Sequence, residues 1–309
     1  MGRPGHRARA LVLNAATLTE AEVASLDARA LIRLEKSIAE TFMGGVPWGS
    51  VAWALVNTAV WFSLWPLTLL GLLPLWAAFP IATVSLALGY LPSHEAQHRI
   101  IARPGERLFW LNELVGHLST LSLVLPYDVA RLTHYEHHKH ANHPELDPDI
   151  STHADGVLDF FRRSLANRQP AGEGDKAYGE TLQRLGTPEA GRALLMAAVY
   201  RLTYFSILFA LAWSGHALEA ALVWWLPRHL AVTYIQYYLS WAPHHPARAL
   251  GRYRDTRAFR SPLGNVLTMG MQFHIIHHLY PRIPLMRTPA AYWAMRPVLR
   301  ARGCELGGL

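Results

Sequence analysis

Two long apolar blocks, at about residues 46–92 and 193–242, limit most strongly what this chain can fold into. A soluble protein spreads its apolar residues with the period of a helix or a strand, not in blocks of this length. The blocks divide near Gly71–Pro74 and Ser214–His216. Because a membrane-spanning helix needs about 20 apolar residues, we expect four spans in two hairpins. These are Trp48–Leu69, Leu75–Leu91 (which can continue as helix into the polar segment after it), Ala193–Trp213 and Leu218–Ala242.

The positive charges agree with this layout. Residues 1–46 contain six Lys or Arg, residues 94–192 contain eleven and residues 244–309 contain ten, whereas the two short connections contain none. By the positive-inside rule, both termini and the middle region are cytoplasmic. Membrane topology therefore explains the net charge of +7, and we find no nucleic-acid motif. Arg228, inside the fourth expected span, is either functional or, as we favour, paired within the helix bundle.

The flanking segments are polar or amphipathic. Pro4–Leu13 contains arginines but no apolar run long enough for a signal peptide, so we expect no cleavage. Thr19–Glu22 forms a capping box before an apolar stripe, which predicts a helix packed on the protein or lying on the membrane surface. Residues 165–192 are polar and contain Gly and Pro, so we expect a cytoplasmic loop. We place domain boundaries to give an N-terminal amphipathic helix (1–45), a membrane domain (46–300) and a tail (301–309).

The histidines occur in clusters with a helical spacing. One cluster is H-x-x-x-H and two are H-x-x-H-H, whereas random placement predicts roughly 0.05 H-x-x-H-H matches in such a chain. Positions i, i+3 and i+4 share one face of a helix, so each cluster directs its imidazoles toward one point. The clusters consist of His94 and His98; His134, His137 and His138; and His274, His277 and His278.

Eight clustered imidazoles are too many for one metal ion and suit two. Nitrogen ligands that leave coordination positions open favour iron and oxygen chemistry, although imidazole also binds zinc or copper. Cys304 is the only cysteine, which excludes an internal disulfide and a cysteine-ligated cluster. His140 and His143 lie off the ligand face, and we interpret His117 as structural or as a neighbour of the ligands. The carboxylates that could orient the rings, or could be solvated loop charges, are Glu95, Glu136, Asp147 and Asp149.

The three clusters, in this order and with four spans, resemble the membrane fatty acid desaturase and hydroxylase superfamily over residues 48–300. The resemblance implies an all-α membrane protein in which a cytoplasmic helical cap holds two irons through the eight clustered histidines. It also implies a ninth ligand at the cytoplasmic end of the fourth span. There the sequence offers His244, which we choose, and His245 as the competing choice. No catalytic residue beyond the metal ligands and no site for an organic cofactor is expected.

The tail resembles one branch of this superfamily. Pro243–Pro246, Gly251–Arg257 and Pro289–Pro297 are similar to segments of carotenoid ring hydroxylases, although acyl desaturases tolerate such tails. The chain departs from many relatives before the third cluster, where Gln272-Phe273 replaces Asn-Tyr. The amide is kept, but its relation to the metal is left open.

The sequence therefore predicts an O2-dependent di-iron oxidoreductase that desaturates or hydroxylates C–H bonds of a lipid, with electrons from an external ferredoxin- or cytochrome-type donor. The alternative is a carotenoid ring hydroxylase or ketolase, and a metal transport protein is the third choice. A transporter carries its ligands at mid-membrane depth, whereas these clusters lie at or beyond the ends of the spans. The sequence does not distinguish a fatty acyl from a carotenoid substrate, or desaturation from hydroxylation.

Overall fold

The computed structural model describes residues 19–168 and 173–309, and every helix or strand assigned in these ranges is a helix. The all-α class is therefore confirmed for the described residues. The expected absence of signal cleavage at Pro4–Leu13 concerns residues outside them. Packing divides the chain into a central unit, Val46–Pro246, and a terminal unit made of residues 19–45 and Ala247–Leu309. The domain boundaries at residues 45 and 300 stay a prediction, since a compact packing unit need not fold alone.

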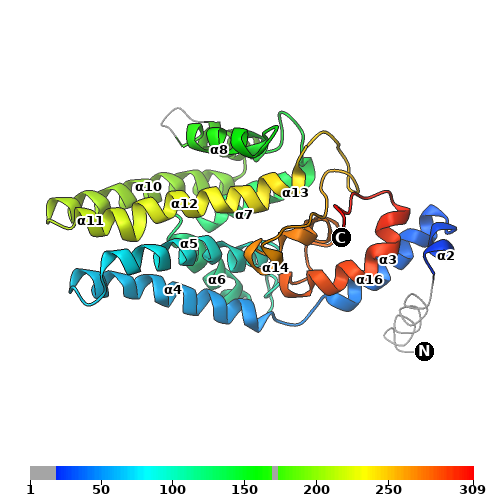
Figure 1. The fold of residues 1–309 in the computed structure, drawn as a ribbon, viewed down its shortest axis with the longest axis horizontal. Helices are drawn as coiled ribbons and strands as arrows, with labels where there is room; N and C mark the ends of the chain where they lie inside the picture. Colours follow the sequence, from blue (N-terminus) through cyan, green and yellow to red (C-terminus); the bar gives the residue numbers. More distant parts are fainter. Residues whose placement is uncertain (1–18, 169–172) are drawn as a thin grey trace. The chain divides into compact units, whose positions relative to one another are not determined.

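The central unit is a bundle of long helices with shorter ones after its histidine-bearing segments (Figure 1). Its elements are α4 (Trp48–Leu69), α5 (Leu75–Gln97), α6 (Phe109–Leu121), α7 (Tyr127–His140), η1 (Ile150–Thr152), α8 (Val157–Ala166), α9 (Glu173–Leu185), α10 (Pro188–Trp213), α11 (Ala217–Glu219), η2 (Ala220–Trp225), α12 (Leu226–Ile235), η3 (Gln236–Trp241) and α13 (Ala242–His244).

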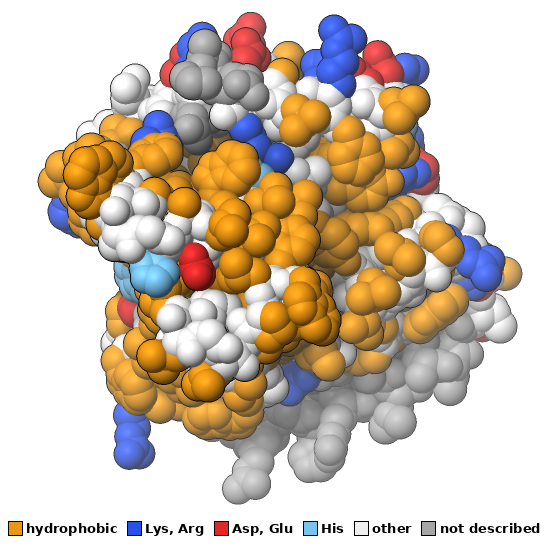
Figure 2. Space-filling view, turned by 60° about the vertical axis from the view of Figure 1, so that its left-hand side comes forward, with side chains coloured by type: hydrophobic (Ala, Val, Ile, Leu, Met, Phe, Trp, Pro, Cys, Tyr) orange, Lys and Arg blue, Asp and Glu red, His pale blue; other side chains and the backbone are white. Residues whose placement is uncertain are grey.

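Among the described residues, α4, α5 and α10 are long and apolar enough to cross a membrane. Figure 2 shows a face of the molecule on which hydrophobic side chains predominate. Large apolar side chains are exposed along all three helices, which suits contact with lipid. Examples are Val56, Phe62, Trp76, Val84, Leu202, Phe205, Phe209 and Trp213.

Helices α4 and α5 pack closely through small and polar groups. Asn57 Nδ2 donates to the Ser85 carbonyl at 2.9 Å, and a Cβ atom at Gly89 would lie only 3.0 Å from the same amide nitrogen. Such contacts let apolar helices approach each other in a membrane, where association gains little from hydrophobic burial. As expected, α5 continues beyond its apolar part to Gln97 and brings the first histidine cluster to its end.

The fourth expected span is helical but is not one α-helix. From Ala217 to His244 the chain passes through α11, the π-helix η2, α12, the π-helix η3 and α13. No α-helix in this run reaches the length of a span, so four spans in two hairpins stay a prediction. Trp224, on η2, packs edge-on against Tyr204 of α10 with ring centroids 4.8 Å apart, which ties this run to the third apolar helix.

The expectation of a loop over residues 165–192 is wrong for most of that segment. Helix α9 occupies Glu173–Leu185, and Thr187 starts α10 by accepting a hydrogen bond from the Ala190 amide at 3.1 Å. Leu182 of α9 is buried against Val129 and Ala190. Tertiary packing of this apolar face outweighs the polar composition that predicted a loop.

The terminal unit joins the two ends of the described chain. Its elements are α2 (Glu20–Ala24), α3 (Ala28–Phe42), α14 (Gly264–Leu267), η4 (Met271–Phe273), α15 (His274–Leu279), η5 (Leu285–Arg287) and α16 (Thr288–Ala301). Helices α3 and α16 lie side by side although they are far apart in the sequence (Figure 1). Their buried apolar residues form one core with α15, which includes Leu34, Ile38, Ile275, Ile276, Tyr292 and Met295.

The predicted capping box is confirmed, because Thr19 and Glu22 exchange hydrogen bonds at the start of α2. The single stripe expected after it forms two helices, since Asp27 caps α3 through the Ala30 amide at 2.7 Å. Val23 and Leu31 are buried in the core of the terminal unit. Of the two alternatives for this segment, the apolar face therefore packs on protein.

A buried carboxylate holds the terminal unit together. Glu35 on α3 is 1% exposed and accepts hydrogen bonds from Tyr253 Oη at 3.0 Å and Tyr280 Oη at 2.9 Å. Its oxygens also lie 3.5 Å from Arg252 Nη2 and 3.6 Å from Arg302 Nε. One charge thus links α3 to the segment before α14, the end of α15 and the end of α16.

Replacing this carboxylate should destabilise the terminal unit. Glu35→Ala leaves the partly buried groups of Tyr253, Tyr280 and Arg302 without their acceptor, and we expect a cost of about 3 kcal/mol. The matched control is Glu40→Ala on the same helix, whose exposed pair with Lys36 spans 3.8 Å. Such a pair contributes less than about 1 kcal/mol. Thermal unfolding in detergent measures both variants, and equal losses would contradict the central role of Glu35.

Candidate metal centre

The first histidine cluster lies at the end of α5. His94 is on the last turn of the helix, and His98 is its C-terminal cap. Both side chains are buried, with 2% and 7% exposure. Because an α-helix repeats every 3.6 residues, this spacing of four places both imidazoles on one side of α5.

Helix α7 carries the second cluster and meets the first. His98 Nε2 lies 2.8 Å from His134 Nε2, which lies 3.1 Å from His138 Nε2. Ligand atoms of His94, His98 and His134 all lie within 4.8 Å of one another. Burial lowers the pKa of His98 and of His134 well below the ordinary value. The rings are therefore neutral, which is the form that binds metal ions.

The remaining histidine of α7 meets the end of the fourth apolar run. His137 Nε2 lies 3.2 Å from His244 Nε2, and both side chains are buried. His245, the competing choice, is more exposed, and its Nδ1 lies 3.2 Å from the Ala154 carbonyl. This geometry favours His244 over His245 within the central unit.

Asp147 supports His137 from behind. Its Oδ1 lies 2.9 Å from His137 Nδ1, and its oxygens also accept from the Asn142 and Asp149 amides at 2.8 and 2.9 Å. Burial alone would raise the pKa of this carboxyl, but its interaction with His137 and its hydrogen bond from the Asp149 amide lower it. The carboxylate keeps the His137 proton on Nδ1 and leaves Nε2 to face a metal ion, as in the carboxylate–histidine pairs of metalloproteins.

The terminal unit carries the third cluster on the short helix α15. His274 and His277 are buried, and the rings of His274 and His278 lie 4.6 Å apart between centroids. Gln272, just before this cluster, is held through its side-chain amide oxygen. That atom accepts from the Ser261 amide at 2.7 Å and fixes the chain before η4.

Two of the three nitrogen–nitrogen distances in the central unit match those of imidazoles bound to one metal ion. Two imidazoles bound to one ion through bonds of about 2.1 Å place their nitrogens about 3.0 to 3.4 Å apart. The three Nε2–Nε2 distances in the central unit are 2.8, 3.1 and 3.2 Å. Imidazole rings at this spacing, one of them backed by a carboxylate, are compatible with the binding of a metal ion.

Other sequence candidates lie elsewhere. Glu136 forms an ion pair with Lys139 at 2.5 Å and approaches His140 at 3.7 Å. His117 is exposed beside the ring of Tyr127, with the ring centroids 5.1 Å apart. Arg228 donates to the Leu123 carbonyl at 2.7 Å, which agrees with pairing inside the bundle.

The sequence did not reveal two side chains that fix Asp149. Tyr178 Oη on α9 donates to Asp149 Oδ1 at 2.9 Å, and Ser240 Oγ on η3 donates to Oδ2 at 2.9 Å. Asp149 Oδ2 lies 4.0 Å from His137 Nδ1. Tyr178 was missed because its segment was expected to be a loop.

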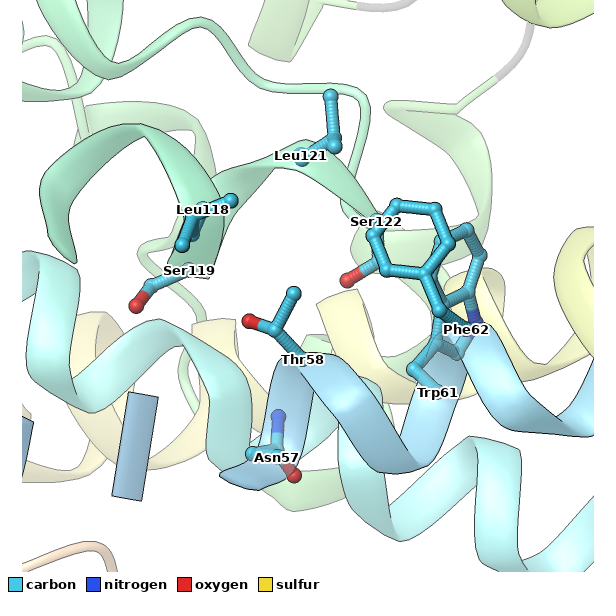
Figure 3. A pocket seen from close by; sticks show the side chains of 8 residues that line it. All are labelled: Asn57, Thr58, Trp61, Phe62, Leu118, Ser119, Leu121 and Ser122. Atoms are coloured by element: carbon cyan, nitrogen blue, oxygen red, sulfur yellow. The ribbon is translucent and has the colours of Figure 1, made fainter. Parts of the chain in front are cut away.

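A small pocket lies apart from the nine histidines, between α4 and α6 (Figure 3). Trp61 and Phe62 of α4 line it together with Leu118 and Ser119 of α6. None of the nine histidines is among its lining residues, so it is not the metal centre.

Comparison with known families identifies the chain. The profile of the family described as fatty acid desaturase matches residues 70–307. The chain therefore belongs to the fatty acid desaturase family. This family lies within the membrane desaturase and hydroxylase superfamily, which the histidine clusters resemble. Relatives in this family are oxidoreductases, and the three apolar helices agree with membrane association.

Curated relatives include desaturases and a carotenoid enzyme. The chain is 25% identical to zeaxanthin 4-ketolase of Chlamydomonas reinhardtii and 23% identical to the chloroplastic omega-3 fatty acid desaturase of Ricinus communis. It is also 23% identical to the chloroplastic sn-2 acyl-lipid omega-3 desaturase (ferredoxin) of Helianthus annuus. Each match covers 82% of this chain, which spans 56% to 63% of the length of these relatives.

Removing the carboxylate behind His137 should weaken metal binding. Asp147→Asn removes the charge that orients the ring, and we expect a 10- to 100-fold loss of affinity, roughly, for a divalent metal. Asp159→Asn is the control, since Asp159 pairs only with Arg163 on α8 among the described side chains. Chelator competition with Co²⁺ as the probe gives both affinities. An Asp147→Asn affinity equal to that of the control would mean that Asp147 does not act through the metal.

Proposed function

We propose that this chain is an O2-dependent di-iron oxidoreductase that desaturates or hydroxylates C–H bonds of a fatty acyl lipid. The observation that carries the proposal is the convergence of buried imidazole nitrogens on α5 and α7 and at His244, with Asp147 behind His137. Family membership supports the same chemistry, because desaturases are among the relatives.

Two irons would be held by nine histidines. The central unit carries six of them and the terminal unit carries three. The proposed ligands are His94, His98, His134, His137, His138, His244, His274, His277 and His278.

Iron held in such a site would supply the redox chemistry that activates O2 toward a C–H bond. The chain's own residues prepare the site. Burial of His94 and His137 keeps bulk water away from the metal, and Asp147 holds the His137 proton on Nδ1. Fixed imidazoles also keep the metal in place relative to the substrate carbon, which determines whether a second hydrogen is lost or an oxygen is added.

The electrons would come from an external donor. Cys304 is the only cysteine, so the described chain offers no thiolate set for an iron–sulfur cluster. Several relatives carry the word ferredoxin in their names, which favours a ferredoxin-type donor over a cytochrome-type one. We further propose four spans with both termini and the metal centre on the cytoplasmic side, on the basis of the Lys and Arg distribution.

A carotenoid substrate is the second candidate. The relative named zeaxanthin 4-ketolase and the tail segments Pro243–Pro246 and Gly251–Arg257 favour a ring hydroxylase or ketolase. The acyl assignment is preferred because acyl desaturases are the more frequent of the relatives above. A metal transporter is the least favoured, because its ligands would lie in the middle of the spans.

Product analysis separates the substrates. The chain is expressed in a carotene-producing host, and both fatty acids and pigments are profiled, with the His137→Ala variant as the inactive control. We expect a new double bond or hydroxyl group in acyl chains and unchanged pigments. A hydroxylated or oxidised carotenoid ring with unchanged acyl chains would contradict the acyl assignment and establish the second candidate.

Metal analysis tests the ligand set. The purified protein should contain about two irons per chain, the number that nine imidazoles imply. His244→Ala and His277→Ala should each lower the iron content and abolish turnover, because each removes a ligand. His245→Ala is the matched control for His244 and should leave iron unchanged. Full iron in His244→Ala together with loss in His245→Ala would reverse our choice of the ninth ligand.

A further inference from the structure

The turn between α6 and α7 lies among the apolar helices of the central unit. Leu118 and Ser122, at the end of α6, line one pocket together with Asn57 and Trp61 of α4 (Figure 3). At about 1.5 Å per residue, Trp61 lies about 12 Å from the nearer end of α4, a helix long and apolar enough to cross a membrane. Helix α6 therefore ends at the depth of the lipid chains, and the chain turns back there.

A backbone turn at that depth needs partners for its carbonyl groups, because lipid chains offer no hydrogen bonds. The Ser122 carbonyl accepts from Trp224 Nε1 on η2 at 2.6 Å, and the Leu123 carbonyl accepts from Arg228 Nε on α12 at 2.7 Å. Val124 has a φ of 58°, a left-handed conformation that is an outlier for a β-branched residue. Two side chains of the fourth apolar run thus hold a strained turn in place.

This turn leads into the helix that carries the second histidine cluster. Helix α7 starts at Tyr127, whose Oη donates to the Ala96 carbonyl of α5 at 2.7 Å. On the last turn of α7, His137 Nε2 lies 3.2 Å from His244 Nε2. The fourth apolar run therefore contacts the α6–α7 segment at two places, once before α7 begins, through Arg228, and once near the end of α7.

We propose that Arg228 and Trp224 are positioning residues, which hold the α6–α7 turn at the depth of the lipid chains and so set where α7 presents its histidines to His244. An arginine within a membrane-spanning run is costly, and this contact gives it a role. The positioning part rests on the metal centre proposed above, whereas the depth of the turn does not.

Fluorescence quenching tests the depth of the turn. Cys304→Ser removes the only native thiol, and Ser122→Cys then adds one at the turn for a bimane label. In vesicles made of lipids brominated in the middle of their acyl chains, we expect loss of the bimane fluorescence, because only a label at that depth meets the bromine atoms. Arg107→Cys, in the exposed segment before α6, is the control and should keep its fluorescence.

Metal affinity tests the positioning role. Arg228→Met keeps the length of the side chain but removes the hydrogen bond to the turn. We expect about a tenfold loss of Co²⁺ affinity, the equivalent of one hydrogen bond made by a charged group, and a shifted visible spectrum, which reports the geometry of the ligands. Arg228→Lys keeps a donor and should restore most of the affinity. Arg192→Met, at an exposed arginine on α10, is the control and should bind Co²⁺ as the unchanged protein does.

Two results would overturn the proposal. Unquenched fluorescence at Ser122→Cys would place the turn outside the lipid chains, and an unchanged Co²⁺ affinity and spectrum in Arg228→Met would mean that this contact does not position the ligands. If Arg228→Met does not fold, Trp224→Phe gives the same test, since it keeps an aromatic ring and loses the donor to Ser122, with the more exposed Trp225→Phe as its control. Failure of the unchanged protein to bind Co²⁺ would instead overturn the metal centre, and the positioning role with it.

Discussion

The hydrogen bond between His137 and Asp147 is the interaction on which the candidate centre depends. It joins α7 to the loop after it, fixes which ring nitrogen carries the proton and leaves the other facing His244. Backbone amides of Asn142 and Asp149 hold the carboxylate from the other side. A buried charge is stable only when its partners are complete, so the loop, the helix and the end of the fourth apolar run are constrained together.

Much of the centre could be predicted because its signals are local. The spacing of His134, His137 and His138 needs only a helical period, and the apolar lengths that predict α4 and α5 need only the thickness of a bilayer. Of the histidines that we selected in the central unit, His98 and His138 lie close to His134, and His137 lies close to His244. Their role as metal ligands stays a prediction. The carboxylate that orients a ring could be narrowed only to four candidates, because proximity in sequence does not show which way a loop folds back.

The features that the sequence did not predict depend on contacts between residues far apart in the chain. Helix α9 has a polar composition, and its formation depends on burying Leu182 against Val129, which is distant in the sequence. The role of Tyr178 was missed for the same reason. The sequence also did not predict the role of Glu35, because its partners Tyr253 and Tyr280 come from the other end of the chain. The composition of a segment gives its intrinsic secondary-structure propensity, whereas tertiary contacts determine the structure that it adopts in the protein.

The π-helix η3 has a consequence for how this protein can change during evolution. A π-helix accommodates an extra residue within a helical turn, and each residue rotates an α-helix by about 100°. The π turn takes up that residue, so loss of one residue between Gln236 and Trp241 that restores ordinary α-helical winding would leave His244 facing His137. Loss of one residue from α12 with the π turns kept would instead turn His244 by about 100° away from His137.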